Sequence, residues 1–471
     1  MTDDERGTPT RTREPGAARA AAVASLAAAL CLIATGDASA QEVPVATPDS
    51  VRRVSLDEAT EIALRRSPSV EQARANLSSS RSAVTGAVGS FLPSVRLGYG
   101  YSSASTGRLD PTGQTITRTS YSTQLTGDVT LFDGMRRFHD LESSRKSAAA
   151  QRQSYQEQRY RALLQVKTAF YNAVAARRRV DVELARVERL RDQLDFVRQQ
   201  IQLGQATRAD SLSTRVDLNN ARVALLNARQ NERSAGFTLG ETMGLDEPVA
   251  PAEAANLEPD SLEWSLGELV AVAREQSPSV RSARLQLQAA EADVSSAQSA
   301  YWPSFSLSGG YDWASENFPP SNRSWSVRVS GSVPLFNGLQ RETSIDRAQA
   351  QLEVSRAQER AAELAVRTDV NDAYSQVETA VAQLDLARES VELARENLRV
   401  TRQRYRQGVA TIVDLQQAQI ALQQAQVDVI RRQFDFQVGV AQLESVIGSD
   451  LEELTPQQTS GVPNSIDEER P

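Results

Sequence analysis

Four stretches of the chain alternate between apolar and polar side chains with a period of two. Two of them follow Pro93 and two follow Pro303. The apolar positions are odd-numbered: Val95, Leu97, Tyr99, Tyr101, Tyr121, Leu125, Val129 and Leu131 in the first pair, and Phe305, Leu307, Tyr311, Trp313, Trp325, Val327, Val329, Val333 and Leu335 in the second. A period of two predicts strands whose two faces meet different surroundings. We therefore expect β-hairpins at about residues 94–132 and 304–336.

The length and the ends of these strands favour a membrane over a protein core. Each strand has about ten residues, enough to cross a bilayer at a tilt of ~45°. Tyr and Trp gather toward the loops, as in an interfacial aromatic girdle. The alternative is a soluble antiparallel sheet with one buried face. Lipid does not tolerate open sheet edges, so a spanning sheet of four strands requires several copies of the chain, and three copies would supply twelve strands.

Beyond each hairpin, apolar residues take up the 3-4 spacing of a coiled coil. The two segments run from Gly134 to Leu203 and from Gly338 to Gln407 without proline, which predicts ~100 Å of helix in each. Their seams combine large side chains with Ala, so that helices can pack closely as a wall. The seam positions are Val166, Ala169, Ala173, Ala176, Val180, Val187, Leu190 and Leu194 in the first segment, interrupted by Glu183, and Val370, Ala373, Val377, Ala380, Leu384, Ala387, Val391, Ala394 and Leu398 in the second.

A glycine turn is expected to end each long helix. Gly204 and Gly408 are suited to the left-handed conformation in which many helices stop. Thr207 and Thr411 follow as candidate N-caps of the returning helices. Each long helix therefore belongs to a helical hairpin whose tip lies far from the strands.

The two halves of the chain resemble each other. Ser67-Pro68-Ser69-Val70 recurs 210 residues later as Ser277-Pro278-Ser279-Val280. After the hairpins the offset is 204, which aligns Leu131-Phe132-Asp133-Gly134 with Leu335-Phe336-Asn337-Gly338. We predict two tandem repeats, at 41–262 and 263–448, each built as helix, β-hairpin, very long helix, turn and helix. A polar tail at 449–471 is expected to be disordered.

The N-terminal residues 1–40 are interpreted as a signal peptide. An apolar run from Ala20 to Ala34 follows Arg11, Arg13 and Arg19 and precedes the small-residue cleavage site Ala38-Ser39-Ala40. A disordered Ala-rich tail is the alternative. Cys31 is the only cysteine and lies within this segment, so the mature chain would carry neither a disulfide nor a thiolate metal site.

Composition argues against an enzyme and against a nucleic-acid partner. His139 is the only histidine, so no His/Cys cluster offers a metal site, and no Gly-rich loop is placed to hold a phosphate. We expect no cofactor and no metal. The net charge of −8 comes without a basic stripe that could hold nucleic acid. Aromatic residues make up only 5% of the chain, which is typical of long helices packed along thin seams.

Taken in order, these motifs resemble the TolC-like outer-membrane factor family. The resemblance rests on the duplicated unit, the prolines that enter the hairpins, the Leu-Phe-Asp/Asn-Gly exit and the tip motif Gly-x-Ala-Thr-x-x-Asp. It implies a homotrimer in the outer-membrane lipid, with a twelve-stranded β-barrel continuous with an α-helical coiled-coil barrel in the periplasm. It further implies an exit duct for efflux or type I secretion that docks to a periplasmic adaptor and an inner-membrane pump. A trimeric coiled-coil surface adhesin or spacer, and a soluble periplasmic helical scaffold, are the alternatives.

The resemblance also implies a periplasmic gate and docking tips. The gate positions fall on Asp414, Tyr405 and Gln417, with Gln417 where the family has a second aspartate, and on Asp210 in the first tip. Asp210 and Asp414 have a simpler interpretation as acids that favour the start of a helix. The residues expected to contact an adaptor are Leu203, Gly204, Gln205, Gln407, Gly408 and Val409.

Overall fold

The computed structural model describes residues 51–109, 115–252, 264–449 and 451. These residues belong to one compact unit that begins at Val51. The expected signal peptide at 1–40 and nearly all of the expected tail at 449–471 lie outside the described residues. No helix in the described ranges is apolar over a sufficient length to span a membrane.

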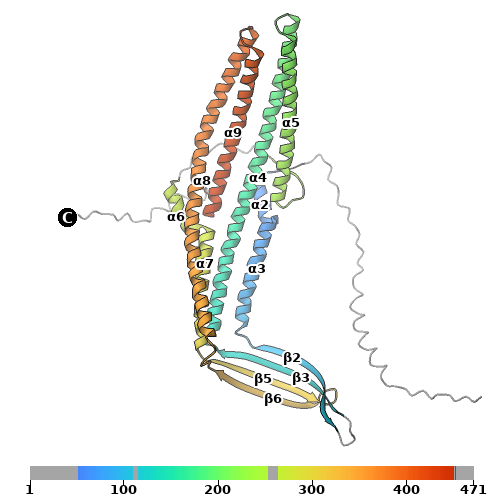
Figure 1. Cartoon of the computed structure of the whole chain (residues 1–471), viewed down its shortest axis with the longest axis vertical. Helices are drawn as coiled ribbons and strands as arrows, with labels where there is room; N and C mark the ends of the chain where they lie inside the picture. Colours follow the sequence, from blue (N-terminus) through green and yellow to red (C-terminus); the bar gives the residue numbers. More distant parts are fainter. Residues whose placement is uncertain (1–50, 110–114, 253–263, 450, 452–471) are drawn as a thin grey trace, which may run out of the picture. The chain divides into compact units, whose positions relative to one another are not determined.

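The same order of elements occurs twice along the chain (Figure 1). The first half contains β1 (Arg52–Val54), α2 (Leu56–Arg66), α3 (Pro68–Gly89), β2 (Ser94–Leu109), β3 (Thr115–Phe132), α4 (Arg136–Gln202) and α5 (Arg208–Thr242). The second half contains β4 (Val249–Pro251), α6 (Leu266–Gln276), α7 (Pro278–Gln298), a short 3-10 turn (Ser299–Tyr301), β5 (Ser304–Ser315), β6 (Asn322–Ser332), α8 (Gln340–Arg406) and α9 (Ile412–Ile447).

The four long strands form one antiparallel sheet in the order β2-β3-β5-β6. With 16, 18, 12 and 11 residues, the strands are longer than the ten expected. The second hairpin also stops short of residue 336, because β6 ends at Ser332. Pro334 has no N–H to offer a sheet, whereas the equivalent Thr130 continues β3.

Two 67-residue helices organise the helical part. α4 packs against α3, α5, α7 and α9, and α8 packs against α6, α7 and α9. The predicted seams are largely buried: Val370, Ala373 and Val377 have no exposed surface. Glu183, which interrupts the first seam, is also buried because its carboxylate accepts a hydrogen bond from Gln423 of α9.

The middle of the molecule carries a small substructure that the sequence patterns did not predict. β1 and β4 pair in parallel, so that a short strand stands near the end of the first predicted repeat. Gly236 and Gly240 of α5 allow β4 and the chain before it to lie close, since a Cβ at Gly240 would come within 2.2 Å of the Glu247 carbonyl oxygen. The helix expected before each hairpin is broken in two at Pro68 and at Pro278, which stand at the start of α3 and α7.

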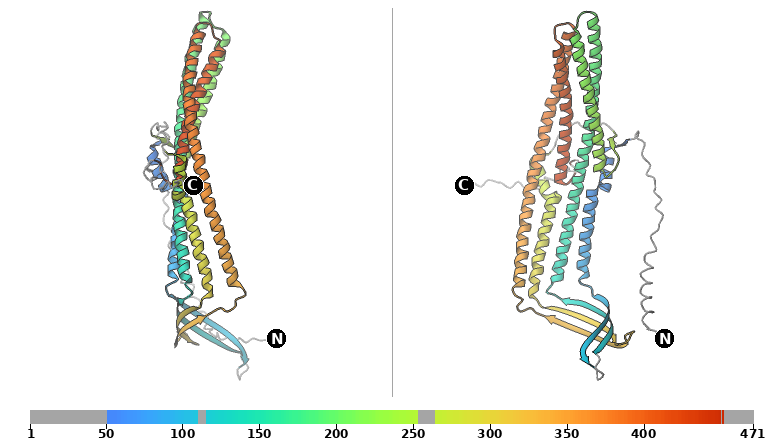
Figure 2. Two further views of the ribbon diagram at one scale, coloured as in Figure 1. Left: turned by 90° about the vertical axis from the view of Figure 1, so that its left-hand side faces the viewer. Right: turned by 45° about the vertical axis from the view of Figure 1, so that its right-hand side comes forward.

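The helices before the hairpins end ahead of the prolines. α3 ends at Gly89 and α7 at Gln298, before Pro93 and Pro303 are reached. Each proline is the last residue before its strand. Figure 2 shows the sheet at one end of the long helices and the two helical tips at the other.

Candidate functional site

The two faces of the sheet differ in chemistry along the whole register. The row Leu97, Leu125, Tyr311 and Trp325 crosses all four strands on one face. The neighbouring row on the other face consists of Arg96, Thr126, Gly310 and Ser326. In the single chain the apolar face is exposed, with Val95 at 72%, Trp325 at 74% and Val329 at 66%. A contiguous apolar face of this size marks contact with lipid or protein.

Aromatic side chains gather at both ends of the apolar face. The rings of Tyr101 and Tyr121 lie 5.1 Å apart at the level of Ser315, the end of β5, and the rings of Tyr311 and Trp313 on β5 lie 4.5 Å apart. At the helical end, Phe132 and Phe305 lie 6.5 Å apart. Tyr311 lies six positions after Phe305, which corresponds to ~20 Å along a strand. An apolar band bounded by two aromatic belts is the arrangement expected at the two surfaces of a bilayer.

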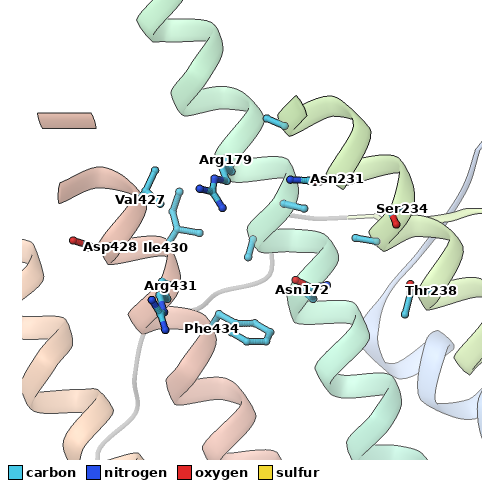
Figure 3. Close-up of a pocket in the computed structure, with 14 residues that line it drawn as sticks. Asn172, Arg179, Asn231, Ser234, Thr238, Val427, Asp428, Ile430, Arg431 and Phe434 are labelled. Carbon is cyan, nitrogen blue, oxygen red and sulfur yellow. The ribbon is translucent and has the colours of Figure 1, made fainter. Parts of the chain in front are cut away.

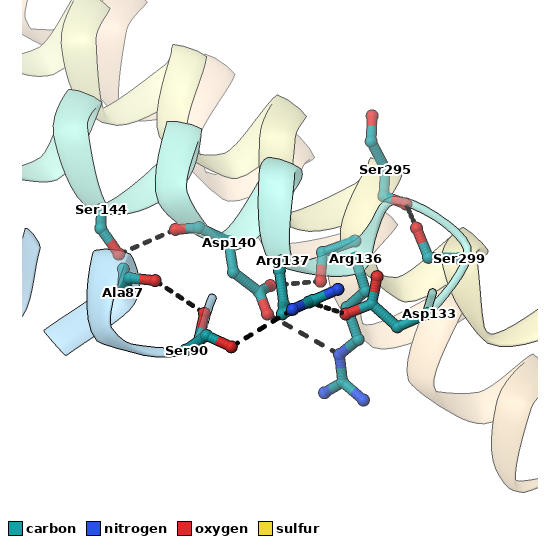
Figure 4. A network of polar contacts seen from close by, with 10 residues as sticks. Ala87, Ser90, Asp133, Arg136, Arg137, Asp140, Ser144, Ser295 and Ser299 are labelled. Atoms are coloured by element: carbon teal, nitrogen blue, oxygen red, sulfur yellow. Dashed lines mark hydrogen bonds and ion pairs between the residues drawn. The ribbon is translucent and has the colours of Figure 1, made fainter. Parts of the chain in front are cut away.

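The passage from sheet to helix is fixed by a polar network at the start of α4 (Figure 4). Arg137 donates to Asp133 at 2.8 Å and to the Ser90 carbonyl oxygen at 3.3 Å, and its guanidinium lies 5.0 Å from the Phe91 ring centre. Gly134 has a φ of +70°, and a Cβ there would meet the Ser299 carbonyl oxygen at 2.6 Å. Arg137 thus joins the start of α4 to the residues that follow α3, and Gly134 lets the chain pass close to Ser299 of the second repeat.

The two tips have the same turn. Gly204 and Gly408 adopt φ values of +73° and +74°, which is the left-handed conformation expected of them. The next residue of each turn donates back to the helix, from Gln205 to the Gln200 carbonyl oxygen at 2.8 Å and from Val409 to the Arg404 carbonyl oxygen at 2.9 Å. Leu203 and Val409 are 67% and 65% exposed, so each tip presents an uncovered apolar side chain.

A capping box begins each returning helix, as the predicted N-caps required. Asp414 accepts from the Thr411 backbone N–H and hydroxyl at 2.8 Å each, and the Asp414 N–H donates to the Thr411 hydroxyl at 3.2 Å. Thr207 and Asp210 repeat the two backbone contacts. The Thr411 backbone N–H, followed by its hydroxyl, lowers the pKa of the exposed Asp414 carboxyl. Asp414 therefore caps the N-terminus of α9, independently of any role in a gate.

The predicted gate residues lie near each other only in part. Tyr405 packs its ring 6.4 Å from that of Phe196 on α4, and Arg406 lies over the same Phe196 ring at 5.5 Å. Burial raises the pKa of Tyr405, and the negative charge of Asp210 adds to the rise. The ring contact with Phe196 thus joins Tyr405 of the second helical hairpin to the first hairpin. Asp414 and Gln417 are both exposed in the single chain.

One contact between the two helical hairpins was not predicted from the sequence. Gln416, the neighbour of the predicted Gln417, donates to the Ser213 hydroxyl at 2.9 Å and to Asp217 on α5. Burial raises the pKa of the Asp217 carboxyl, and the hydrogen bond from Gln416 opposes the rise. No pattern within one segment could have paired residues 199 positions apart.

Comparison with known proteins identifies the family of this chain. The family model described as outer membrane efflux protein matches residues 59–245 and 269–449. The chain belongs to the outer membrane efflux protein family. Its place is the outer membrane, with the helical part in the periplasm, and its family consists of channels and not of enzymes.

Relatives of this efflux protein cover most of its length. Protein CyaE of Bordetella pertussis is 29% identical over 378 residues, which is 79% of each chain. Outer membrane protein TolC of Escherichia coli is 23% identical over 374 residues, covering 76% of this chain and 75% of TolC. The crystal structure of CusC superposes with a TM-score of 0.74 at 17% identity, covering 85% of this chain and 93% of CusC. The shared fold is thus that of known outer-membrane channels.

The efflux protein has a hollow of about 510 Å³ between α4, α5 and α9 (Figure 3). Its lining includes Arg179 from α4, Asn231 from α5, and Arg431 and Phe434 from α9. Figure 3 shows these side chains on three different helices around one opening. The hollow lies between the two helical hairpins, and both polar and apolar side chains line it.

Proposed function

We propose that the protein is the outer-membrane exit duct of a tripartite efflux or type I secretion system. Three copies would close their sheets into a twelve-stranded β-barrel that continues into an α-helical barrel in the periplasm. A periplasmic adaptor and an inner-membrane pump would deliver the cargo, which the duct passes to the exterior. The observation that carries this proposal is the four-stranded sheet with one apolar face, two aromatic belts and unpaired edges.

The unpaired edges support assembly into a ring. β2 and β6 are the edge strands of the sheet, and their outer backbone groups have no partner strand in the single chain. Lipid cannot form hydrogen bonds with these backbone groups, whereas β2 of a second copy can pair with β6 of the first. A surface adhesin with a single terminal barrel segment is less suited to a chain in which two hairpins interrupt the helices at matched places.

Assembly and conduction test this function together. The protein purified in detergent from outer membranes is expected to be a trimer by light scattering and to form single channels in planar bilayers. Carbonate washing should leave it in the membrane, because the apolar face of its sheet is buried in lipid. A stable monomer that keeps its β-sheet signal in circular dichroism would contradict the proposal.

We assign adaptor docking to the tips. Leu203, Gly204 and Gln205 in the first tip, and Gln407, Gly408 and Val409 in the second, share one turn geometry and lie farthest from the sheet. Exposed Leu203 and Val409 offer apolar contacts to a partner helix. The adaptor is thus expected to recognise the same shape twice in each protomer.

Gly408→Val is expected to reduce cargo flux without reducing the amount of trimer. A β-branched residue at a φ of +74° strains the turn by about 1–2 kcal/mol, and it does so far from the barrel. Gly408→Asn is the matched control, because Asn tolerates the left-handed conformation. Cross-linking between the tip and the adaptor measures docking directly, and unchanged cross-linking in the Val variant would refute this assignment.

We further propose that Asp414, with Tyr405, Gln417 and Asp210, forms the periplasmic gate. Around a threefold axis, three Asp414 carboxylates would come together at the narrow end. The contact of the Tyr405 ring with Phe196 supports a link between the two helical hairpins of one protomer. Gln417 supplies no second charge, so one acidic ring is expected.

A further inference from the structure

The hollow between α4, α5 and α9 has an apolar floor and apolar walls. α5 and α9 each pack against α4, and the hollow lies over α4 between them (Figure 3). The small side chains of Ala175 and Ala176 on α4 leave this space open. Its walls include Ala228, Ala235, Val427, Ile430 and Phe434. A volume of about 510 Å³ lies in the range of sites that hold small molecules.

The polar side chains of the hollow have no protein partners. Arg179 and Arg431 come from different helical hairpins, and within the described part of the chain neither forms a hydrogen bond or an ion pair. Both are exposed, so both guanidinium groups are accessible to a ligand. The amide and hydroxyl side chains that line the hollow are likewise without partners among the described residues: Asn172, Asn231, Ser234 and Thr238.

The charge of the hollow is positive. Asp428 is the one carboxylate among the described lining residues, against the two guanidinium groups of Arg179 and Arg431. The two cations and one anion leave one positive charge. Other arginines of these helices pair with an acid nearby, as Arg161 does with Glu157. Unpaired arginines around an apolar floor are therefore a feature of this hollow and not of the helices in general.

The second repeat has a hollow at the equivalent place with the opposite charge. It measures about 550 Å³ and lies between α8 and α9. Its two acids, Asp372 and Asp435, outnumber Arg432, which pairs with Asp435 at 3.3 Å. At the offset of 204, Arg179 corresponds to Gln383 and Asn231 to Asp435. The repeat thus provides two hollows of similar size, of which only the first carries unpaired cations.

This chemistry defines a class of ligand. Guanidinium groups such as those of Arg179 and Arg431 bind carboxylates and sulfonates through paired hydrogen bonds. The amides of Asn172 and Asn231 can donate further hydrogen bonds to the same group. The apolar floor suits a ring or a short hydrocarbon chain, because burying it removes apolar surface from water. One net positive charge matches a ligand with one negative charge.

The hollow opens on the side of α4 away from β1 and β4. Phe170 and Val174 of α4 pack in one cluster with these two strands, and Arg177 donates to the Pro251 carbonyl oxygen at 3.5 Å. Arg179 lies two positions after Arg177, which is about 200° around the helix. A folded substructure inside a duct would obstruct it, so β1 and β4 belong on the outside. The hollow then faces the inside.

We propose that this hollow is a binding site for amphipathic monoanions, molecules that carry one carboxylate or sulfonate on an apolar body, on the inner wall of the duct. Its position on the inner wall rests on the proposed function, whereas the binding site itself does not. Asn172 lies 36 positions after Arg136, the start of α4, or about 50 Å along the helix from the sheet. The ligand is therefore a dissolved molecule and not a lipid of the bilayer. Cargo of this class would contact the wall as it passes.

Equilibrium dialysis of 2-naphthalenesulfonate tests the site. The full chain is held in nanodiscs of neutral lipid, with empty nanodiscs as the blank. We expect saturable binding of one molecule per chain, weakened by added salt. The neutral analogue 2-naphthalenemethanol should bind about tenfold more weakly or less, because it lacks the charge that the two arginines recognise.

The second repeat supplies matched variants. Arg179→Gln and Arg431→Asn install the residues found at the equivalent positions, Gln383 and Asn227. Each should weaken binding of 2-naphthalenesulfonate about tenfold while the yield of protein and its circular dichroism stay unaltered. Arg177→Gln removes a cation from the other side of α4 and should leave binding unaltered.

A cysteine at the hollow tests where it opens. In a Cys31→Ser background, Asn231→Cys is treated with a charged methanethiosulfonate during recording in planar bilayers. Modification should lower the single-channel conductance in steps, because the added group projects into the duct. Added 2-naphthalenesulfonate should slow the modification, since both occupy the same hollow.

Each result decides one part of the proposal. Equal binding of the sulfonate and the neutral analogue, or binding that persists in Arg179→Gln and Arg431→Asn, overturns the site. Modification of Asn231→Cys that leaves conductance unaltered overturns its place on the inner wall. Unaltered protein that forms neither trimers nor channels contradicts the proposed function, while the dialysis result still decides whether the hollow binds monoanions.

Discussion

Leu307→Arg is expected to prevent assembly in the outer membrane. Leu307 lies directly between Val129 and Val329 in the sheet, in the middle of the apolar face. An arginine near the midplane of a bilayer costs about 2–4 kcal/mol on the lipid face of a β-barrel, and each trimer would carry three. The measurement is the amount of heat-modifiable trimer in washed outer membranes. Val329→Arg should act in the same way, since it occupies the same row.

Ser308→Arg is the matched control one residue along the same strand. Ser308 faces the other side, between Asp128 and Arg328, where a new cation meets one carboxylate and one guanidinium. If that side faces the water-filled lumen, the variant should assemble at close to the normal level. Equal losses for Leu307→Arg and Ser308→Arg would contradict the assignment of the two faces.

The hairpins and long helices could be predicted because each rests on a local period. Alternation along β2 places Val95 and Leu97 on the face they occupy, whatever strand lies beside them. Heptad spacing likewise fixes which side of α8 is buried, as Val370 and Val377 illustrate. Thr411 and Asp414 form their capping box from residues three apart, which the sequence displays directly.

Contacts between distant segments could not be predicted in this way. β1 and β4 have three residues each, too few for a period, and their pairing depends on the close approach that Gly236 and Gly240 permit. The early end of β6 at Ser332 could have been anticipated from Pro334, which cannot donate to a sheet. The partners of Gln416 could not, because side chains on α5 and α9 meet only once the hairpins pack together.

Asp414 illustrates how a predicted site residue can have a structural role as well. Its carboxylate accepts two hydrogen bonds from Thr411, which lower its pKa in the single chain. A group with a lowered folded pKa stabilises the fold above its ordinary value, about 4, and loses that contribution as the pH falls toward the lowered pKa. Around a threefold axis, repulsion among three such carboxylates would act in the opposite direction and raise part of their titration.

Asp414→Asn is expected to abolish cation selectivity and block by divalent cations. The amide keeps an oxygen that can accept from the Thr411 N–H, so the start of α9 should survive while the charge of the ring is lost. Asp210→Asn removes the matching acid of the first capping box and should change selectivity less, which separates the charge of the gate from helix capping. Reversal potentials in asymmetric KCl and conductance with added divalent cations measure both properties. Because Gln417 leaves one acidic ring, block should also be relieved as the pH falls and the carboxylates of that ring become protonated. If Asp414→Asn leaves selectivity and block unchanged, Asp414 only starts α9, and the narrow point of the duct lies elsewhere.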